Sequence, residues 1–330
     1  MTARSETIDR RRFLLRTGTA LGTLSLATLL PAFHSSAAPL RYDLRPVALA
    51  DGVWVVHGAQ ETMTRQNGGA IANIGIIATR DGAVVIDTGP SRRYGEELAA
   101  LAVHLTGKPV VRAYLTHIHP DHVFGNQAFA SGALAATQSV ADVLGKLGEG
   151  FASAMYHSAG DWMRGTELVL PATILTGTSE EIGGRRFQLL ALDGHTASDL
   201  VVLDERSGTV FAGDLAFLDR APTTPHATIP RWHASLTVLR GLAASRLVPG
   251  HGPVEAGARA IDQTSAWLAM LEERIGMAFD RGLTMTEAFA EPLPAWTDRI
   301  ALARYEYERS VMHMLPKLES SRWPRVDRAD

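Results

Sequence analysis

The feature that most constrains this chain is a short cluster of metal-binding side chains in its first half. Three histidines and one aspartate fall within the six residues that begin at His117. A strand-like run at 109–116 leads into the cluster, and side chains on a strand alternate between its two faces. His117 and His119 are therefore expected to point the same way. The proline that follows ends regular strand pairing, so Asp121 and His122 can face a second ion.

The residue types of this cluster indicate a metal site of a particular chemistry. A carboxylate beside neutral imidazoles suits zinc and similar borderline ions. The chain has no cysteine, which excludes disulfides, thiolate ligands and a thiol nucleophile. The alternative is an ordinary strand end whose histidines face solvent or core. We favour the metal site, because such a dense motif is rare by chance and more histidines and aspartates follow it on loops.

Length and composition set the broad class of protein. The chain has 330 residues, enough for one large domain or a domain with an appendage. Apolar residues make up 46% of it, so a sizeable core can form. The net charge is only −3 and no basic block is present, so a nucleic-acid partner is not expected.

Residues 1–38 are interpreted as an export signal. Arg10-Arg-Arg-Phe-Leu-Leu15 precedes a mildly apolar run at 17–30, and small residues at 35–38 fit a cleavage site. The apolar run is too short for a comfortable membrane span, so no stable membrane insertion is expected after signal removal. The Arg-Arg-x-Phe-Leu arrangement resembles a bacterial twin-arginine signal, which implies a periplasmic protein exported already folded. A general secretory signal and an uncleaved anchor are the alternatives.

The remaining pattern predicts a strand-rich domain over 39–255 and a helical extension over 256–330. Strands are expected at 52–57, 71–78, 83–87, 187–192, 200–203 and 209–212. Helices are expected at 91–105, 122–129, 139–164, 258–282 and 296–318, the third with breaks at Gly145, Gly148 and Gly150. The Pro- and Thr-rich segment 215–232 is expected to be a loop that forms a wall of the substrate pocket.

Five motifs in order resemble those of the metallo-β-lactamase fold superfamily. Thr-His-Ile-His-Pro-Asp-His at 116–122 resembles its signature, and the other four lie at 85–89, 193–196, 211–214 and 248–252. The resemblance covers residues 50–255. It implies an α+β fold, a four-layer αββα sandwich, with a C-terminal helical appendage.

The resemblance also implies a ligand set for two zinc ions. Each ion would have three ligands of its own, the first His117, His119 and His195, and the second Asp121, His122 and His251. Asp214 would bridge both ions, and a bridging hydroxide would attack the substrate, with Asp121 and Asp214 as the catalytic residues. Iron or manganese at one position is an alternative. Asp87 would support a ligand imidazole, or would serve only as a turn residue.

Departures from the family pattern narrow the expected function. Asp214 stands where many β-lactamases of this fold have Cys or Ser, so an exported zinc hydrolase of thioesters, esters, lactones or related small molecules is favoured over a β-lactamase. The runs at 67–73, 87–94 and 220–226 resemble SoxH-like, or quinoprotein relay system, metallohydrolases. That resemblance implies a link to periplasmic sulfur or quinoprotein oxidation. A further alternative is a non-catalytic metal-binding accessory to a periplasmic quinoprotein dehydrogenase.

Several polar residues near the predicted pocket have no role assigned by the sequence. They lie on the 215–232 segment, just after it, or on the last helix: His226, His233, Tyr305, Tyr307, Arg309 and His313. Neither His226 nor His233 is expected to bind a metal ion. The helix residues either reach over the site or form the polar and packing faces of the helix.

Overall fold

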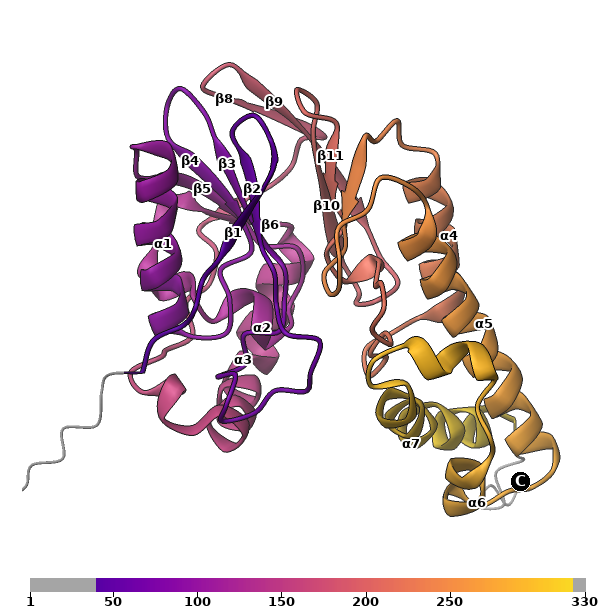
Figure 1. Cartoon of the computed structure of the whole chain (residues 1–330). Helices are drawn as coiled ribbons and strands as arrows, with labels where there is room; N and C mark the ends of the chain where they lie inside the picture. Colours follow the sequence, from indigo (N-terminus) through magenta and orange to yellow (C-terminus); the bar gives the residue numbers. More distant parts are fainter. Residues whose placement is uncertain (1–39, 323–330) are drawn as a thin grey trace, which may run out of the picture. The chain divides into compact units, whose positions relative to one another are not determined.

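The computed structural model describes residues 40–322, and from Leu40 onward these residues belong to one compact unit. The expected export signal at 1–38 lies outside the described residues. Two β-sheets face each other, and helices cover their outer faces (Figure 1). No helix in the described range is long and apolar enough to cross a membrane.

The first sheet has its strands in chain order. They are β1 (Pro46–Ala50), β2 (Val53–Val56), β3 (Ile74–Ala78), β4 (Ala83–Ile86), β5 (Val110–Tyr114), β6 (Leu134–Ala136) and β7 (Thr173–Ile174). Pairing is antiparallel from β1 to β4 and parallel from β4 to β7. Because parallel strands share one direction, the residues that follow β4 and β5 meet at the same sheet edge. Asp87 and His117 are among these residues.

The second sheet has the order β12-β11-β10-β9-β8. Its strands are β8 (Ser179–Ile182), β9 (Arg185–Leu192), β10 (Asp199–Asp204), β11 (Thr209–Phe211) and β12 (Arg246–Val248). Both β9 and β11 pair antiparallel with β10, and β12 pairs parallel with β11. The carboxyl ends of β9, β11 and β12 therefore lie at one edge. His195, Asp214 and His251 follow these three strands.

Apolar side chains between the sheets form the central core. Val53, Val55, Ile77, Val84, Phe187 and Val202 belong to this core, and all six are fully buried. The strands read as nearly continuous apolar runs because both of their faces are covered. Each such side chain contributes about 1.5–3 kcal/mol relative to an exposed one.

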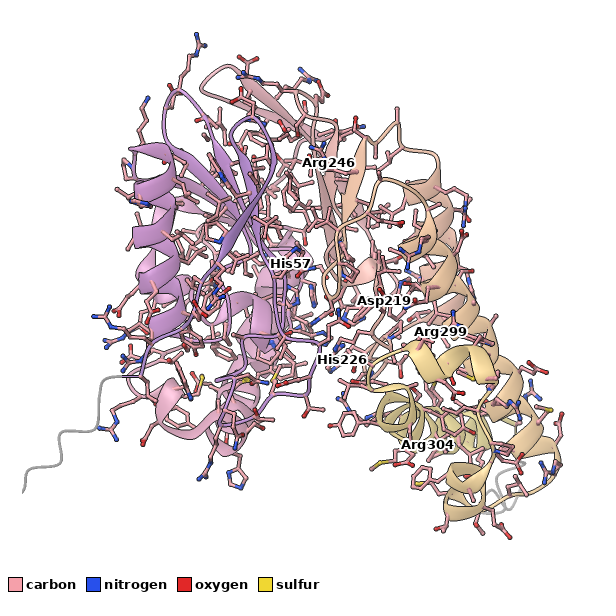
Figure 2. The ribbon with its side chains drawn as sticks, in the orientation of Figure 1. His57, Asp219, His226, Arg246, Arg299 and Arg304 are labelled. Carbon is pink, nitrogen blue, oxygen red and sulfur yellow. The ribbon has the colours of Figure 1, made fainter. Side chains whose placement is uncertain are left out.

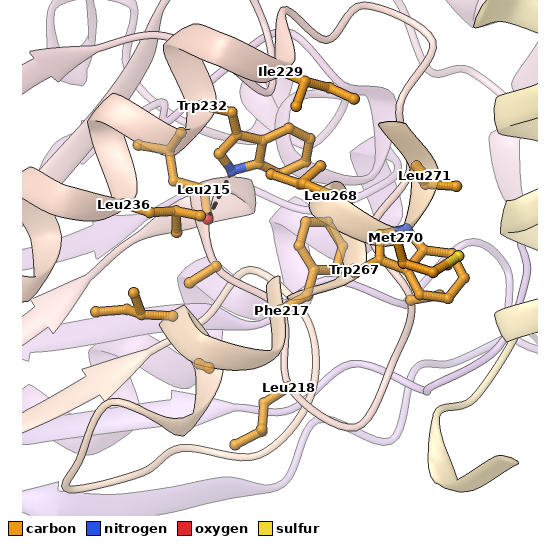
Figure 3. Close-up of a cluster of buried hydrophobic side chains, with 14 of the residues drawn as sticks. Leu215, Phe217, Leu218, Ile229, Trp232, Leu236, Trp267, Leu268, Met270 and Leu271 are labelled. Atoms are coloured by element: carbon orange, nitrogen blue, oxygen red, sulfur yellow. Dashed lines mark hydrogen bonds between the residues drawn. The ribbon is translucent and has the colours of Figure 1, made fainter. Parts of the chain in front are cut away.

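Helices complete the four layers, as the sequence predicted. The helices α1 (Arg92–Thr106) and α3 (Gln138–Ala159) cover the first sheet, and α4 (Ile229–Arg240) and α5 (Arg259–Asp280) cover the second. A C-terminal helical segment of α6 (Met285–Ala290) and α7 (Ala303–Arg322) follows. Trp232, Trp267 and Phe217 lie in the apolar cluster that joins α4 and α5 to the second sheet (Figure 3).

Helix α1 matches its sequence prediction closely. The Ser91 side chain accepts a hydrogen bond from the Tyr94 N–H at the helix start. Gly107 ends the helix in the left-handed conformation, with φ 70°. Helix α3 also lies where the pattern predicted it, but the predicted breaks at Gly145, Gly148 and Gly150 are wrong, because the helix continues through all three glycines. A Cβ at Gly148 would lie 2.6 Å from the Leu168 side chain, so this glycine allows close packing.

The structure also places the boundaries of three other predicted elements differently from the sequence prediction. The helix expected at 122–129 is a single turn, α2 (Pro120–Val123), followed by a 3-10 turn at Asn126–Ala128. The loop expected at 215–232 ends earlier, because α4 begins at Ile229 after the capping position Thr228. The last helix begins at Ala303 rather than at 296.

Candidate metal centre

The loops at the shared sheet edges bring the seven predicted ligands together. One group comprises His117, His119, His195 and Asp214, and an adjoining group comprises Asp121, His122 and His251. The potential ligand atoms within each group all lie within 4.8 Å of one another. Every one of the seven residues is buried, and the most exposed of them retains 8% of its surface. His117 and His119 lie beyond the end of β5, on a loop rather than on the strand.

The separations between potential ligand atoms fit metal coordination. Zinc–nitrogen bonds of about 2.0–2.1 Å place neighbouring ligands of a tetrahedral ion about 3.3 Å apart. In the first group, His195 Nε2 lies 2.9 Å from His119 Nδ1 and 3.2 Å from Asp214 Oδ2. In the second, Asp121 Oδ2 lies 3.4 Å from His251 Nε2 and 3.6 Å from His122 Nε2.

Asp214 lies between the two groups. Its Oδ1 is 3.2 Å from His122 Nε2, and its Oδ2 is 3.4 Å from His251 Nε2 and 3.7 Å from His117 Nε2. A Cβ at position 250 would lie 1.9 Å from Asp214 Oδ1, so Gly250 is required beside this carboxylate. The carboxylate can therefore face two ions at once.

Buried polar atoms without partners give the most direct indication that a cation belongs in the site. His117 Nε2 has no hydrogen-bond partner among the described residues, and the 3.2 Å approach of His122 Nε2 to Asp214 Oδ1 lacks the geometry of a hydrogen bond. Leaving such atoms unsatisfied costs about 1–3 kcal/mol each. A metal ion satisfies imidazole lone pairs and a carboxylate together, so these residues fit the metal pair that the sequence predicted.

The Asp87 carboxylate orients two imidazoles, that of His122 directly and that of His117 through Thr116. Its Oδ2 accepts a hydrogen bond from His122 Nδ1 at 2.7 Å and from Thr116 Oγ1 at 2.8 Å, while its Oδ1 accepts from the Thr116 N–H. Thr116 Oγ1 in turn lies 2.9 Å from His117 Nδ1. Both histidines therefore carry the proton on Nδ1 and present Nε2 to the site. Asp87 has a left-handed backbone, with φ 64°.

The His251 loop is held by an asparagine that the sequence did not single out. His251 Nδ1 lies 2.8 Å from the Ile71 carbonyl, which leaves Nε2 facing the cluster. Asn73 Nδ2 donates to the carbonyls of Pro249 and Gly252, both at 2.8 Å. Asn73 belongs to the 67–73 run used for the family resemblance, and this was the only signal that could have identified it.

The His195 turn depends on a buried aspartate that sequence reasoning also missed. Asp199 accepts hydrogen bonds from the backbone N–H groups of His195 and Thr196 and from Thr196 Oγ1. Burial raises the pKa of Asp199 to about 6, because desolvation outweighs the attraction of His195. Trp232 packs edge-on against the His195 ring, with centroids 4.9 Å apart. Asp199 follows His195 by four residues, a spacing that indicates a turn but not its role.

His119 is held differently from the other imidazoles. Its Nδ1 faces His195, and its Nε2 forms a 2.9 Å hydrogen bond with His226 Nδ1. His226 therefore contacts a candidate ligand and belongs to neither group. Figure 2 shows His226 between the first-sheet half of the fold and the C-terminal helices.

The site's electrostatics keep the imidazoles of His117 and His119 neutral and make the surroundings of His122 attractive to a cation. Burial, with the neighbouring histidines, lowers the pKa of both His117 and His119 well below the ordinary value. Burial would also lower the pKa of His122, but the carboxylates of Asp214, Asp121 and Asp87 raise it well above that value. The same carboxylates attract a metal ion. Burial would raise the pKa of Asp214, yet the surrounding histidines hold it well below its usual range.

A cavity of about 350 Å³ opens onto the metal-facing residues. His119, Asp121, Asp214 and His251 form its floor, and Arg220, Thr223, Pro225, His226, Tyr305, Glu306 and Arg309 are among its walls. The segment expected to be a pocket wall thus lines the cavity, together with one face of α7.

The remaining residues without an assigned role do not line this cavity. Tyr307 is buried in helix packing, where its hydroxyl donates to the Ala288 carbonyl at 3.0 Å. His233 contacts Ser265 and lies 3.6 Å from Glu272, both on α5. His313 is exposed on α7.

Comparisons with known proteins agree with this geometry. The family profile described as "Metallo-beta-lactamase superfamily" matches residues 67–251. A search of curated proteins gives no match. Among solved structures, a metallo-beta-lactamase from Pontibacter korlensis has 23% identity and a TM-score of 0.56, covering 68% of this chain and 99% of its own. A metallo-beta-lactamase from Hirschia baltica has 20% identity and a TM-score of 0.55, covering 68% and 97%.

A third solved structure matches a larger part of this chain. The stereoselective inverting sec-alkylsulfatase of a Pseudomonas species has 17% identity and a TM-score of 0.63, covering 83% of this chain and 50% of its own. At such identities the structures share the fold, while the family profile covers more than half of the chain. The chain therefore belongs to the metallo-β-lactamase superfamily.

Proposed function

We propose that this protein is a binuclear zinc hydrolase of small thioesters, esters, lactones or related compounds. The observation that carries the proposal is the shared position of Asp214 between two adjoining groups of buried ligand atoms. An all-His and carboxylate set of this kind suits zinc. Asp214, in place of a cysteine or serine, favours these substrates over β-lactams.

Each part of the site has a distinct role in the proposal. His117, His119 and His195 would hold one ion and Asp121, His122 and His251 would hold the other, with the Asp214 carboxylate lying between the two groups. When bound, the ions would supply Lewis-acid polarisation of the substrate and an acidified water molecule. Asp121 borders the cavity, where its carboxylate could accept a proton from a group that enters the site. Phe217 stacks on His251 with ring centroids 5.2 Å apart and keeps bulk water from that imidazole.

The test is hydrolysis by the purified, zinc-loaded protein. A panel of a thioester, a lactone, an aryl phosphodiester and a chromogenic cephalosporin separates the substrate classes. Turnover of the thioester or lactone, lost in Asp214→Asn, is the expected result. His157→Asn is the matched control, because this exposed histidine on α3 belongs to neither ligand group and does not line the cavity. Full activity of Asp214→Asn would overturn the site assignment.

A β-lactamase is the second candidate, because the similar structures include proteins named metallo-beta-lactamases. Turnover of the cephalosporin alone would favour it. The accessory role beside a quinoprotein dehydrogenase is the third. It predicts bound metal, no turnover of any substrate, and co-purification with a quinoprotein.

We also propose export to the periplasm by the twin-arginine route. The Arg-Arg-x-Phe-Leu motif at 10–14 supports this proposal, and so do the ligands, which must be loaded in a folded protein. Replacing Arg10 and Arg11 by lysine should retain the protein in the cytoplasmic fraction. Unchanged periplasmic recovery of that variant would exclude the twin-arginine route.

A further inference from the structure

The cavity wall contains an arginine whose burial requires an explanation. Arg220 is 3% exposed and lines the cavity above the metal-facing residues. Its Nε has no hydrogen-bond partner among the described residues, and its Nη1 reaches only the Ala221 carbonyl, at 3.4 Å. Burying a guanidinium group with unused donors is costly. An anion in the cavity would offset the positive charge of this group.

A second arginine reaches the same cavity from α7. Arg309 Nη1 donates to Thr223 Oγ1 at 3.0 Å and to Glu306 Oε2 at 3.0 Å. Its guanidinium carbon lies 5.5 Å from the Tyr305 ring centroid. These contacts use one terminal nitrogen and fix the plane of the group. Its Nε and Nη2 donors have no hydrogen-bond partner among residues 40–322.

Glu306 joins the two arginines but does not neutralise both. Glu306 is 1% exposed, and its Oε1 lies 3.8 Å from Arg220 Nη2. Burial raises the pKa of Glu306, against the opposing effect of Arg309 and Arg220. Two guanidinium groups therefore face one carboxyl group, and positive charge is in excess in either protonation state. The excess is a single unit when Glu306 is ionised, which matches a carboxylate better than a phosphate dianion.

We propose that Arg220 and Arg309, aligned by Glu306, form a subsite for a carboxylate carried by the substrate away from the reacting bond. The inference rests on the proposed hydrolase function and deepens it, because it makes the substrate a carboxylate-bearing ester, thioester or lactone. The planar guanidinium fork binds carboxylates in a defined orientation, so this subsite would also position the scissile bond over the metal centre.

Binding of simple diacids tests the subsite without any turnover. The probes are malonate, succinate, glutarate and adipate, each compared with its monoamide by calorimetric titration of the zinc-loaded protein. Both members of a pair offer one carboxylate to the metal, and only the diacid offers a second to the arginines. At least one diacid should bind about tenfold or more tightly than its monoamide, as expected for hydrogen bonds to a charged group.

Substitutions test whether the two arginines cause the preference for a diacid over its monoamide. Arg309→Met should abolish it, and Arg309→Lys should keep part of it. Arg45→Met is the matched control, since Arg45 is 83% exposed, pairs with Asp43 and does not line the cavity. Arg309 is one-third exposed, so its replacement should fold, and circular dichroism verifies this. Arg220→Met is a second variant with the same expected loss.

The possible results of this experiment distinguish failure of the carboxylate subsite from failure of the proposed hydrolase function. Absence of diacid binding, equal binding of every diacid and its monoamide, or a preference that survives Arg309→Met and Arg220→Met overturns the subsite. If the diacid preference is present but no substrate is hydrolysed, the subsite stands and the hydrolase proposal fails. If substrates are hydrolysed without any diacid preference, only the subsite fails.

Discussion

His226 and His119 meet through their ring nitrogens, 2.9 Å apart, on the side of His119 that faces away from His195. This contact connects the pocket-wall segment to a metal-facing imidazole of the signature motif. Partners of this kind orient a ligand ring, and their loss lowers metal affinity about 10–100-fold.

Replacing His226 by leucine should therefore weaken zinc binding by about 10–100-fold while leaving the fold intact. The reason is that the His119 ring loses the partner that orients it. Competition with a chromogenic chelator measures the affinity. His104→Leu is the matched control, because this exposed histidine on α1 does not line the cavity. Equal affinity of His226→Leu and wild type would show that the contact does not support the site.

Asp87→Asn should impair both metal binding and stability. Asparagine tolerates the left-handed backbone at this position, so the change tests the side chain alone. Its amide cannot accept from His122, Thr116 Oγ1 and the Thr116 N–H together, and a buried donor left unpaired costs about 1–3 kcal/mol. Urea unfolding of the metal-free and zinc-loaded forms gives both effects. Wild-type behaviour of both forms would assign Asp87 to the turn alone.

Asn73→Ala should destabilise the metal-free protein by about 1–3 kcal/mol, because the carbonyls of Pro249 and Gly252 lose their donors. The loop that carries His251 then loosens, so the second ion should bind more weakly than the first. Stepwise zinc titration measures this difference. Asn73→Asp is the informative companion, since it keeps the acceptor for the Gly58 N–H but removes both donors. Equal weakening of both ions would contradict a local role.

A buried ion pair far from the metal residues should govern acid stability. Arg185 donates to both oxygens of Asp204, at 2.7 and 2.6 Å. Burial would raise the pKa of Asp204, but the arginine and Ser207 lower it below its usual value. The folded carboxylate thus loses its proton more readily than an unfolded aspartate, whose pKa is about 3.9. Its stabilisation is complete above that value and is lost as pH falls through the folded pKa.

Asp204→Asn should therefore cost about 3–5 kcal/mol near neutral pH, because it leaves Arg185 buried without its counter-charge. The difference from wild type should stay constant down to about pH 5 and shrink below about pH 4. Urea unfolding across this range measures it. A difference that does not change with pH would mean that the carboxylate's charge contributes nothing.

Resemblance of the ordered motifs to a known superfamily predicted the fold and named seven candidate ligands, and the structure brings these seven residues together. Asp121 and His122 follow His117 and His119 directly, and His195, Asp214 and His251 each follow a strand, so the sequence pattern placed these residues on loops. Sequence reasoning failed where packing against distant residues determines the local structure. The α3 glycines stay helical because tertiary contacts outweigh a cost of about 1 kcal/mol each.

The pocket walls could not be predicted for a similar reason. Arg220 and Arg309 lie 89 residues apart in the sequence, the difference between their residue numbers. Only the packing of α7 shows that Arg309 reaches the cavity while Tyr307 turns into the core. Asn73 and Asp199 act through backbone groups of other loops, and no short motif records such contacts.

The most direct test of the central claim is anomalous diffraction from zinc-loaded crystals, recorded above and below the zinc absorption edge. The account predicts two anomalous peaks about 3.5–4 Å apart, one beside His117, His119 and His195 and one beside Asp121, His122 and His251, with Asp214 between them. A single peak, or zinc bound only elsewhere on the protein, would contradict the binuclear site.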